Sequence, residues 1–82
     1  MAHQIMESTK VTLDVRNTPP WERHPRIFNI LASFVPGDVL SLTYDHDPRP
    51  LRYQLMIEFA NQFEYSSVEK GPKEWYVTIK RI

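Results

Sequence analysis

The sequence contains no cysteine among its 82 residues. Disulfide bonds, thiolate metal ligands, iron–sulfur clusters and thiol nucleophiles are therefore excluded, because each needs a cysteine sulfur. There is also no excess of charge of either sign, since ten basic residues balance ten acidic ones. General nucleic-acid binders and polybasic membrane anchors carry a surplus of Lys and Arg, so the composition argues against both.

Long apolar runs are missing as well. No stretch approaches the roughly 20 apolar residues that a bilayer-spanning helix needs, and Met1–Thr9 lacks the apolar segment of a signal peptide. We therefore expect a cytoplasmic protein that does not associate with membranes. A chain of 82 residues has room for one hydrophobic core. We predict a flexible tail over residues 1–9 and a single domain over residues 10–82.

Alternation of apolar and polar residues predicts four strands. They are expected at residues 11–16, at residues 40–45, from Phe63 onward and at residues 75–80, with a Gly71-Pro72 turn between the last two. Apolar residues at helical spacing predict two helices between the first three strands. The expected apolar stripes are Ile27, Phe28, Ile30, Leu31 and Phe34 in the first helix, and Leu51, Leu55, Met56, Phe59 and Ala60 in the second.

Proline and aspartate mark the expected helix starts. The first helix is predicted to begin at Pro25, because proline suits the first helical position, and to stop near Pro36-Gly37. The second is predicted to have Asp47 as its N-cap and Pro48 at its first position.

This order predicts an α+β two-layer sandwich, β-α-β-α-β-β, with a four-stranded mixed sheet and two helices on one face. The first two strands flank a helix, so they should be parallel, and both helices should then start at the same edge of the sheet. The segments that feed the helices, residues 19–25 and 45–50, should meet there. The other sheet face is polar, which is compatible with a monomer or a weak homodimer.

Two histidines form the centre of the candidate site. His24 and His46 can act as metal ligands or as acid and base. With Asp45, and with Glu22 or Asp47 nearby, they would suit Zn²⁺ or non-haem Fe²⁺. The structural alternative is a polar network, in which Asp47 caps a helix and Asp45 satisfies backbone donors of its turn.

Four arginines lie near the same edge, and they also allow two readings. Arg16, Arg23, Arg49 and Arg52 could attract a small anion or an acidic group of a partner, or they could pair with Asp14, Glu22, Asp45 and Asp47. Trp21 lies outside both apolar stripes in a proline-rich segment. It either covers the core or projects as a contact residue.

Two motifs carry a resemblance to a known family. Glu22-Arg23-His24-Pro25 and Asp45-His46-Asp47-Pro48-Arg49-Pro50-Leu51, together with Leu13-Asp14-Val15-Arg16, resemble the uncharacterised bacterial family called domain of unknown function 2249. The resemblance covers about residues 11–81. It implies a fold similar to the TusA/SirA sulfur carriers and a genomic neighbourhood of hemerythrin-like, cupin-like and respiratory or nitrogen-oxide proteins. It implies no established activity.

The sulfur carriers have a Cys-Pro pair before their first helix, and the cysteine carries the persulfide. The corresponding segment here, residues 17–21, contains prolines and no thiol, so sulfur transfer by that mechanism is excluded.

We interpret the chain as a small binding or regulatory module rather than a stand-alone enzyme. It is expected to recognise a redox- or metal-related partner protein, or a small ligand, at the edge formed by the helix N-termini. The expected binding residues are Trp21, Glu22, Arg23, His24, Asp45, His46, Asp47 and Arg49. No cofactor is required by this interpretation. The alternative is a protein that binds a divalent zinc or iron ion through His24, His46 and Asp45.

Overall fold

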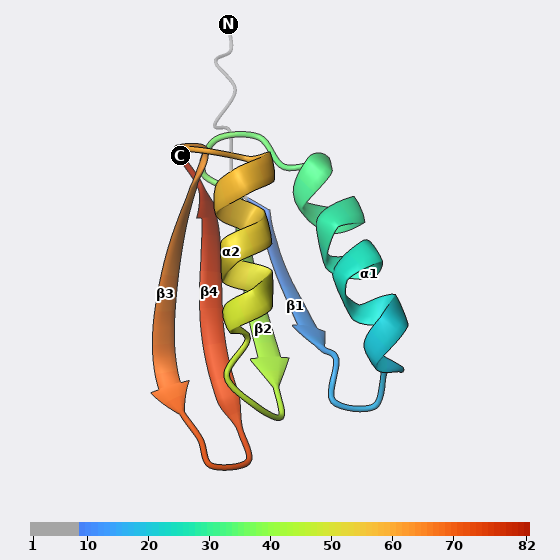
Figure 1. The fold of residues 1–82 in the computed structure, drawn as a ribbon. Coiled ribbons are helices and arrows are strands. Elements are labelled where there is room, and N and C mark those ends of the chain that lie inside the picture. The colour runs from blue at the N-terminus through green and yellow to red at the C-terminus, as the bar shows by residue number, and fades with distance from the viewer. Residues whose placement is uncertain (1–8) are drawn as a thin grey trace, which may run out of the picture.

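Figure 1 shows the fold in a computed structural model, which describes residues 9–82. Four strands and two helices follow one another in the predicted order. Their bounds are Lys10–Asp14 for β1, Pro20–Ala32 for α1, Val39–Tyr44 for β2, Arg49–Glu58 for α2, Phe63–Lys70 for β3 and Trp75–Arg81 for β4. Residues 1–8, most of the predicted tail, lie outside the described residues.

The sheet has the strand order β1-β2-β4-β3. β1 and β2 pair in parallel, whereas β4 runs antiparallel to both of its neighbours, β2 and β3. Both helices lie on the same face of the sheet (Figure 1). This arrangement confirms the predicted α+β sandwich. It also places the carboxyl ends of β1 and β2, and the starts of both helices, at one end of the sheet.

The hydrophobic core fills the space between the sheet and the helices. Its buried members are Val15, Ile27, Leu31, Phe34, Leu40, Leu42, Tyr44, Leu51, Leu55, Val77 and Ile79. A fully buried aliphatic or aromatic side chain contributes about 1.5–3 kcal/mol relative to an exposed one. Tyr44 is the only member of this cluster that brings a polar atom into the core.

Helix α1 begins at Pro20, so the predicted start at Pro25 is wrong. The buried stripe consists of Arg23, Ile27 and Leu31 at four-residue spacing. Because an arginine fills the first position of this stripe, a search for apolar residues does not detect the first turn. Pro25 lies inside the helix, where it cannot donate the backbone hydrogen bond to the carbonyl four residues earlier.

Helix α2 has Pro48 as its N-cap, and no side chain caps it, so the prediction for Asp47 is wrong. The backbone N–H of Arg52 donates to the carbonyl of Pro48 at 3.1 Å, which closes the first helical turn on Pro48. Asp47 lies one residue too early to cap. Its Oδ2 instead accepts a hydrogen bond from Nε of Arg49 at 3.1 Å.

The apolar stripe of α2 is narrower than predicted. Leu51 and Leu55 are buried and Phe59 packs against the core at the helix end. Met56, which was expected in the stripe, is 60% exposed, and Ala60 lies beyond the end of the helix at Glu58. Leu51, Leu55 and Phe59 follow one another at four-residue spacing, so they share one narrow face of the helix. This face is enough to pack so short a helix against the sheet.

The sheet face without helices is polar, as predicted. One row across all four strands consists of hydroxyl side chains, with Thr12 paired to Ser41, Ser41 to Thr78 and Thr78 to Ser66.

Within residues 9–82, no helix is long and apolar enough to cross a membrane.

Candidate functional site

The two helix N-termini border a small hollow, which we call the interhelix cleft. It has a volume of about 160 Å³ and is lined by Pro20, Arg23, His24, Tyr44, His46, Pro48 and Pro50. Typical pockets for drug-sized ligands measure roughly 300–1,000 Å³, so an occupant of this cleft would be small. Both segments that the sequence singled out contribute to it, and the parallel pairing of β1 and β2 brings them together.

Arg23 is the buried polar anchor of the cleft, with a side chain only 8% exposed. Its Nε donates to the carbonyl of Thr18 at 2.9 Å and one Nη donates to the carbonyl of Arg16 at 3.3 Å. The two Nη atoms also donate to the two carboxylate oxygens of Asp45 at 3.0 and 3.1 Å. The guanidinium lies 5.5 Å from the ring centre of Tyr44. A buried charge is tolerated when it is paired and hydrogen-bonded in this way.

Asp45 connects the arginine to a histidine. Hydrogen bonding to Arg23 is the largest cause that lowers the pKa of Asp45 to about 2, and a further hydrogen bond to His46 acts in the same direction. Its Oδ1 lies 2.7 Å from Nδ1 of His46. Because an ionised carboxylate only accepts, Nδ1 of His46 carries the proton and Nε2 keeps the lone pair when the ring is neutral.

His24 is oriented by a chain of side chains on α2. Nε2 of Gln54 donates to Oε2 of Glu58 at 2.6 Å, which turns Oε1 of Gln54 toward Nδ1 of His24 at 2.7 Å. An amide oxygen only accepts, so this network assigns the proton of a neutral His24 to Nδ1. Both histidines that line the cleft therefore use Nδ1 for an internal contact and keep Nε2 for other partners.

Tyr44 is a site residue that sequence reasoning did not identify. It is the last residue of β2, it is 2% exposed, and its ring meets that of His46 edge-on with centres 5.3 Å apart. Its hydroxyl is fully buried and has no hydrogen-bond partner among residues 9–82. Burial raises the pKa of Tyr44, so the group stays protonated. A buried hydroxyl without a partner is costly and rare in folded proteins.

The helix N-termini themselves offer few backbone donors to an anion. Pro20 occupies the first turn of α1, and Pro50 occupies the first turn of α2. Neither residue has an N–H group. The N–H of Glu22 already donates to the carbonyl of Pro19 at 2.9 Å. Side chains rather than backbone amides therefore decide what this edge can bind.

Five of the eight predicted binding residues do not line the cleft. Trp21 and Glu22 line a different hollow of α1, together with Pro25, Arg26 and Asn29. Trp21 lies in the first turn of α1 and not in a loop, and its 77% exposure favours a contact residue over a cover for the core. Asp47 and Arg49 line another hollow, on the side of α2 that faces β3. Asp45 supports the cleft through Arg23 and His46 without lining it.

Three of the four arginines near this edge are neutralised by acidic partners. Arg16 pairs with Asp14 and Glu74, Arg23 with Asp45, and Arg49 with Asp47. For these three, the pairing interpretation of the sequence is confirmed. The guanidinium of Arg52 instead lies 5.4 Å from the ring centre of Tyr65.

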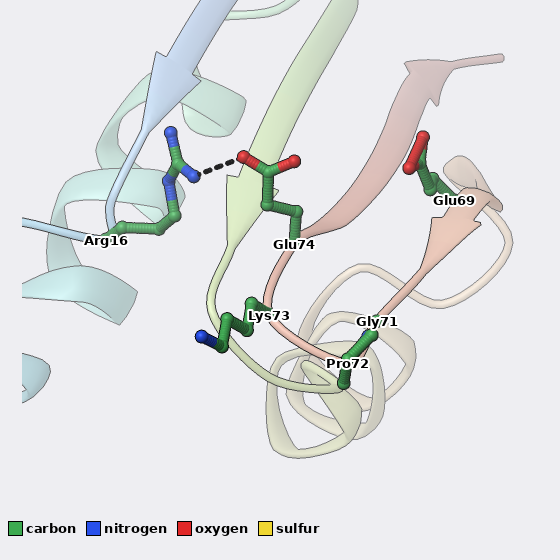
Figure 2. A pocket seen from close by; sticks show the side chains of 6 residues that line it. All are labelled: Arg16, Glu69, Gly71, Pro72, Lys73 and Glu74. Carbon is green, nitrogen blue, oxygen red and sulfur yellow. Dashed lines mark hydrogen bonds and ion pairs between the residues drawn. The ribbon is translucent and has the colours of Figure 1, made fainter.

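Figure 2 shows a further hollow, of about 420 Å³, at the turn between β3 and β4. Arg16 donates to Oε2 of Glu74 at 2.7 Å (Figure 2), and its other nitrogens hold both oxygens of Asp14. The pKa of Asp14 is lowered, with the hydrogen bond from Arg16 as the largest cause. We interpret this cluster as a structural link between the end of β1 and the β3–β4 turn, because its opposite charges pair with one another.

A metal centre of three or more protein ligands is not found in the described part of the chain. No group of three His, Asp or Glu side chains within residues 9–82 lies close enough to hold an ion. The remaining candidate ligands are the two imidazoles of the cleft.

Fold and site together define a class: a small α+β sandwich with a hydrogen-bonding cleft between the N-termini of its two helices. Within this class the chain belongs to the family described as "Uncharacterized conserved protein (DUF2249)", whose model matches residues 12–81. The resemblance drawn from the two motifs is thereby confirmed. The search of curated proteins found no match, and neither did the search of solved structures. The likeness to the TusA/SirA fold stays a prediction.

Proposed function

We propose that this protein is a binding module for a small polar ligand, which occupies the interhelix cleft. The observation that carries the proposal is the hydroxyl of Tyr44, which is buried and unpartnered among residues 9–82 while its residue lines the cleft. The hydroxyl itself is closed to solvent, so a ligand oxygen or nitrogen would reach it through a small opening of the cleft and would then remove the cost of leaving it unsatisfied.

The cleft also limits what the ligand can be. Its walls include the exposed rings of Pro20 and Pro50, which give it apolar surface, and two imidazoles, which offer Nε2 as an acceptor when neutral. Arg23 adds little net attraction for anions, because Asp45 already pairs with it. We therefore infer a small, mostly neutral ligand with at least one acceptor and one N–H or O–H donor, such as an amide or a nitrogen heterocycle.

The small volume favours such a ligand over a segment of a partner protein. Stable protein interfaces bury about 800 Å² on each partner, whereas this cleft accommodates only a small group. The sequence led us to expect either a redox- or metal-related partner protein or a small ligand, and of these two we propose the small ligand.

The proposal is tested by NMR titration of ¹⁵N- and ¹³C-labelled protein with acetamide, imidazole, pyrazole and acetate. Saturable shifts confined to Tyr44, His24 and His46 would support it. In Tyr44→Phe, the affinity of such a fragment should fall about three- to tenfold, the equivalent of one neutral hydrogen bond. The matched control is Tyr53→Phe, because Tyr53 is 65% exposed and lies outside the cleft. Equal affinity in Tyr44→Phe and the wild type would contradict the proposal.

A second candidate is a divalent metal ion held by His24 and His46. It is favoured by the side-chain oxygens that hold Nδ1 of each ring at 2.7 Å, since metal-binding histidines are commonly oriented by such contacts. Water or a small ligand would have to supply the remaining coordination positions.

A further inference from the structure

We call the hollow that Asp47 and Arg49 line, on the side of α2 that faces β3, the basic hollow. It measures about 330 Å³ and is lined by Arg49, Arg52, Tyr65, Ser67, Lys70 and Trp75, and by Asp47 in the loop before α2. The start of α2, the end of β3 and the start of β4 lie at the same end of the sheet (Figure 1). The basic hollow shares no lining residue with the interhelix cleft, so a ligand could bind in one whether or not the other is a binding site.

The charges around the basic hollow do not cancel. Three cations line it and one carboxylate, Asp47, which is paired with Arg49 through a 3.1 Å contact. Within residues 9–82, neither Arg52 nor Lys70 takes part in an ion pair. Two positive charges on two different elements, α2 and β3, are thus left without an acidic partner in this part of the chain.

Two aromatic rings complete the hollow. Tyr65 and Trp75 are both partly buried, and the guanidinium of Arg52 stacks 5.4 Å from the ring centre of Tyr65. The ring of Trp75 lies so close to Gly71 that an added Cβ there would be 2.8 Å from it. The indole is therefore packed against the turn, which fixes one wall of the hollow. Ser67 adds a hydroxyl that can donate a hydrogen bond.

We propose that the basic hollow binds a phosphate monoester that carries a flat ring, with the phosphate between Arg52 and Lys70 and the ring against Trp75. Such a phosphate carries about −1.5 to −2 charges at pH 7, which matches the two cations that have no acidic partner within residues 9–82. Its three oxygens suit the planar donors of an arginine. Stacking on an indole adds a preference for a ligand with a π face.

The test is an NMR titration of the full chain with phenyl phosphate, inorganic phosphate and phenol. Phenyl phosphate should shift the indole signal of Trp75 saturably and leave that of Trp21, which lies 77% exposed on α1, unchanged. Inorganic phosphate and phenol should each bind about tenfold more weakly, because each lacks one of the two contacts. Adenosine monophosphate in place of phenyl phosphate then shows whether the ring is a nucleobase.

Variants that lose one positive charge, each with a matched control, distinguish a specific phosphate site from general electrostatic attraction of the ligand to the protein. Arg52→Gln and Lys70→Gln should each weaken phenyl phosphate about tenfold or more, the loss of one charge-assisted contact. Arg26→Gln and Lys73→Gln remove the same charges outside the hollow and should change the affinity less than about twofold. Equal losses in the variants and their controls would overturn the proposal. So would equal affinity for phenyl phosphate and inorganic phosphate, or shifts confined to Tyr44 and His24.

Discussion

Arg23 and Asp45 form a bidentate ion pair that joins α1 to the loop after β2, with nitrogen–oxygen distances of 3.0 and 3.1 Å. The arginine side chain is 8% exposed, whereas that of Asp45 is 41% exposed. A charge from the buried stripe of a helix therefore reaches its partner at the surface. This pair also fixes the position of His46, which shares Oδ1 of Asp45.

We predict that Asp45→Asn destabilises the protein by about 1–3 kcal/mol, because it leaves a buried guanidinium without a charged partner. The free energy of unfolding from urea titration measures the effect. Asp47→Asn is the matched control: its partner Arg49 is 77% exposed, so the loss should stay below about 1 kcal/mol. Equal effects of the two substitutions would mean that Arg23 does not depend on Asp45.

The same pair predicts acid sensitivity. The pKa of Asp45 is lowered to about 2 from a usual 3.8, so its contribution to stability is complete above about pH 4 and is lost as the pH falls toward 2. The free energy of unfolding should therefore fall in this interval, and Asp45→Asn should make the fall shallower. Asp14, whose pKa Arg16 also lowers, contributes in the same acid range. The variant should reduce the dependence rather than abolish it.

The sequence predicted the fold because the period of its apolar residues is local information. β1, β2, β4 and the start of β3 show alternation, and the core residues Ile27, Leu31, Leu51 and Leu55 follow the helical period. The site was harder to predict, because its key contacts join residues far apart in the chain. Arg23 reaches Asp45 across 22 residues, and His24 meets Gln54 across 30. No spacing rule shows which charged residue will be buried.

Tyr44 illustrates the same limit. It follows Leu40 and Leu42 at two-residue spacing, on the buried side of β2, but this pattern does not show whether the hydroxyl finds a partner. The signal that could have identified it is its position: a tyrosine on the buried face, directly before the segment that contains Asp45 and His46. A polar-tipped aromatic at the carboxyl end of a strand lies where ligands of such sheets commonly bind.

We predict that Tyr44→Phe leaves the ligand-free protein as stable as the wild type, or more stable by up to about 1 kcal/mol. Removing a buried hydroxyl without a partner costs no hydrogen bond and relieves desolvation. Thermal unfolding followed by circular dichroism measures the difference. A loss of more than about 1 kcal/mol would show that the hydroxyl is satisfied in solution, and Tyr44 would then give no reason to expect a ligand in the cleft.

Metal binding makes a prediction of its own. If His24 and His46 hold a divalent ion, one equivalent of Zn²⁺ should shift the ring signals of both, and His46→Ala should abolish the shift of His24 as well. His3, outside the described residues, is the internal control for non-specific binding. Shifts of His3 alone, or of one cleft ring without the other, would exclude the two-histidine site.

Pro25 offers a test of where α1 begins. The sequence predicted that the helix starts at Pro25, whereas in the structure it starts at Pro20. Pro25 lies inside α1, on the exposed surface, and its ring leaves one helical carbonyl without its usual donor. Pro25→Ala restores that donor, which favours the helix by up to about 3 kcal/mol, but it also frees the unfolded chain, which offsets roughly 1 kcal/mol. We expect a net gain of about 1–2 kcal/mol in the free energy of unfolding, measured by urea titration. A loss of stability would instead show that the helix starts at Pro25 in solution, where proline is the favoured residue.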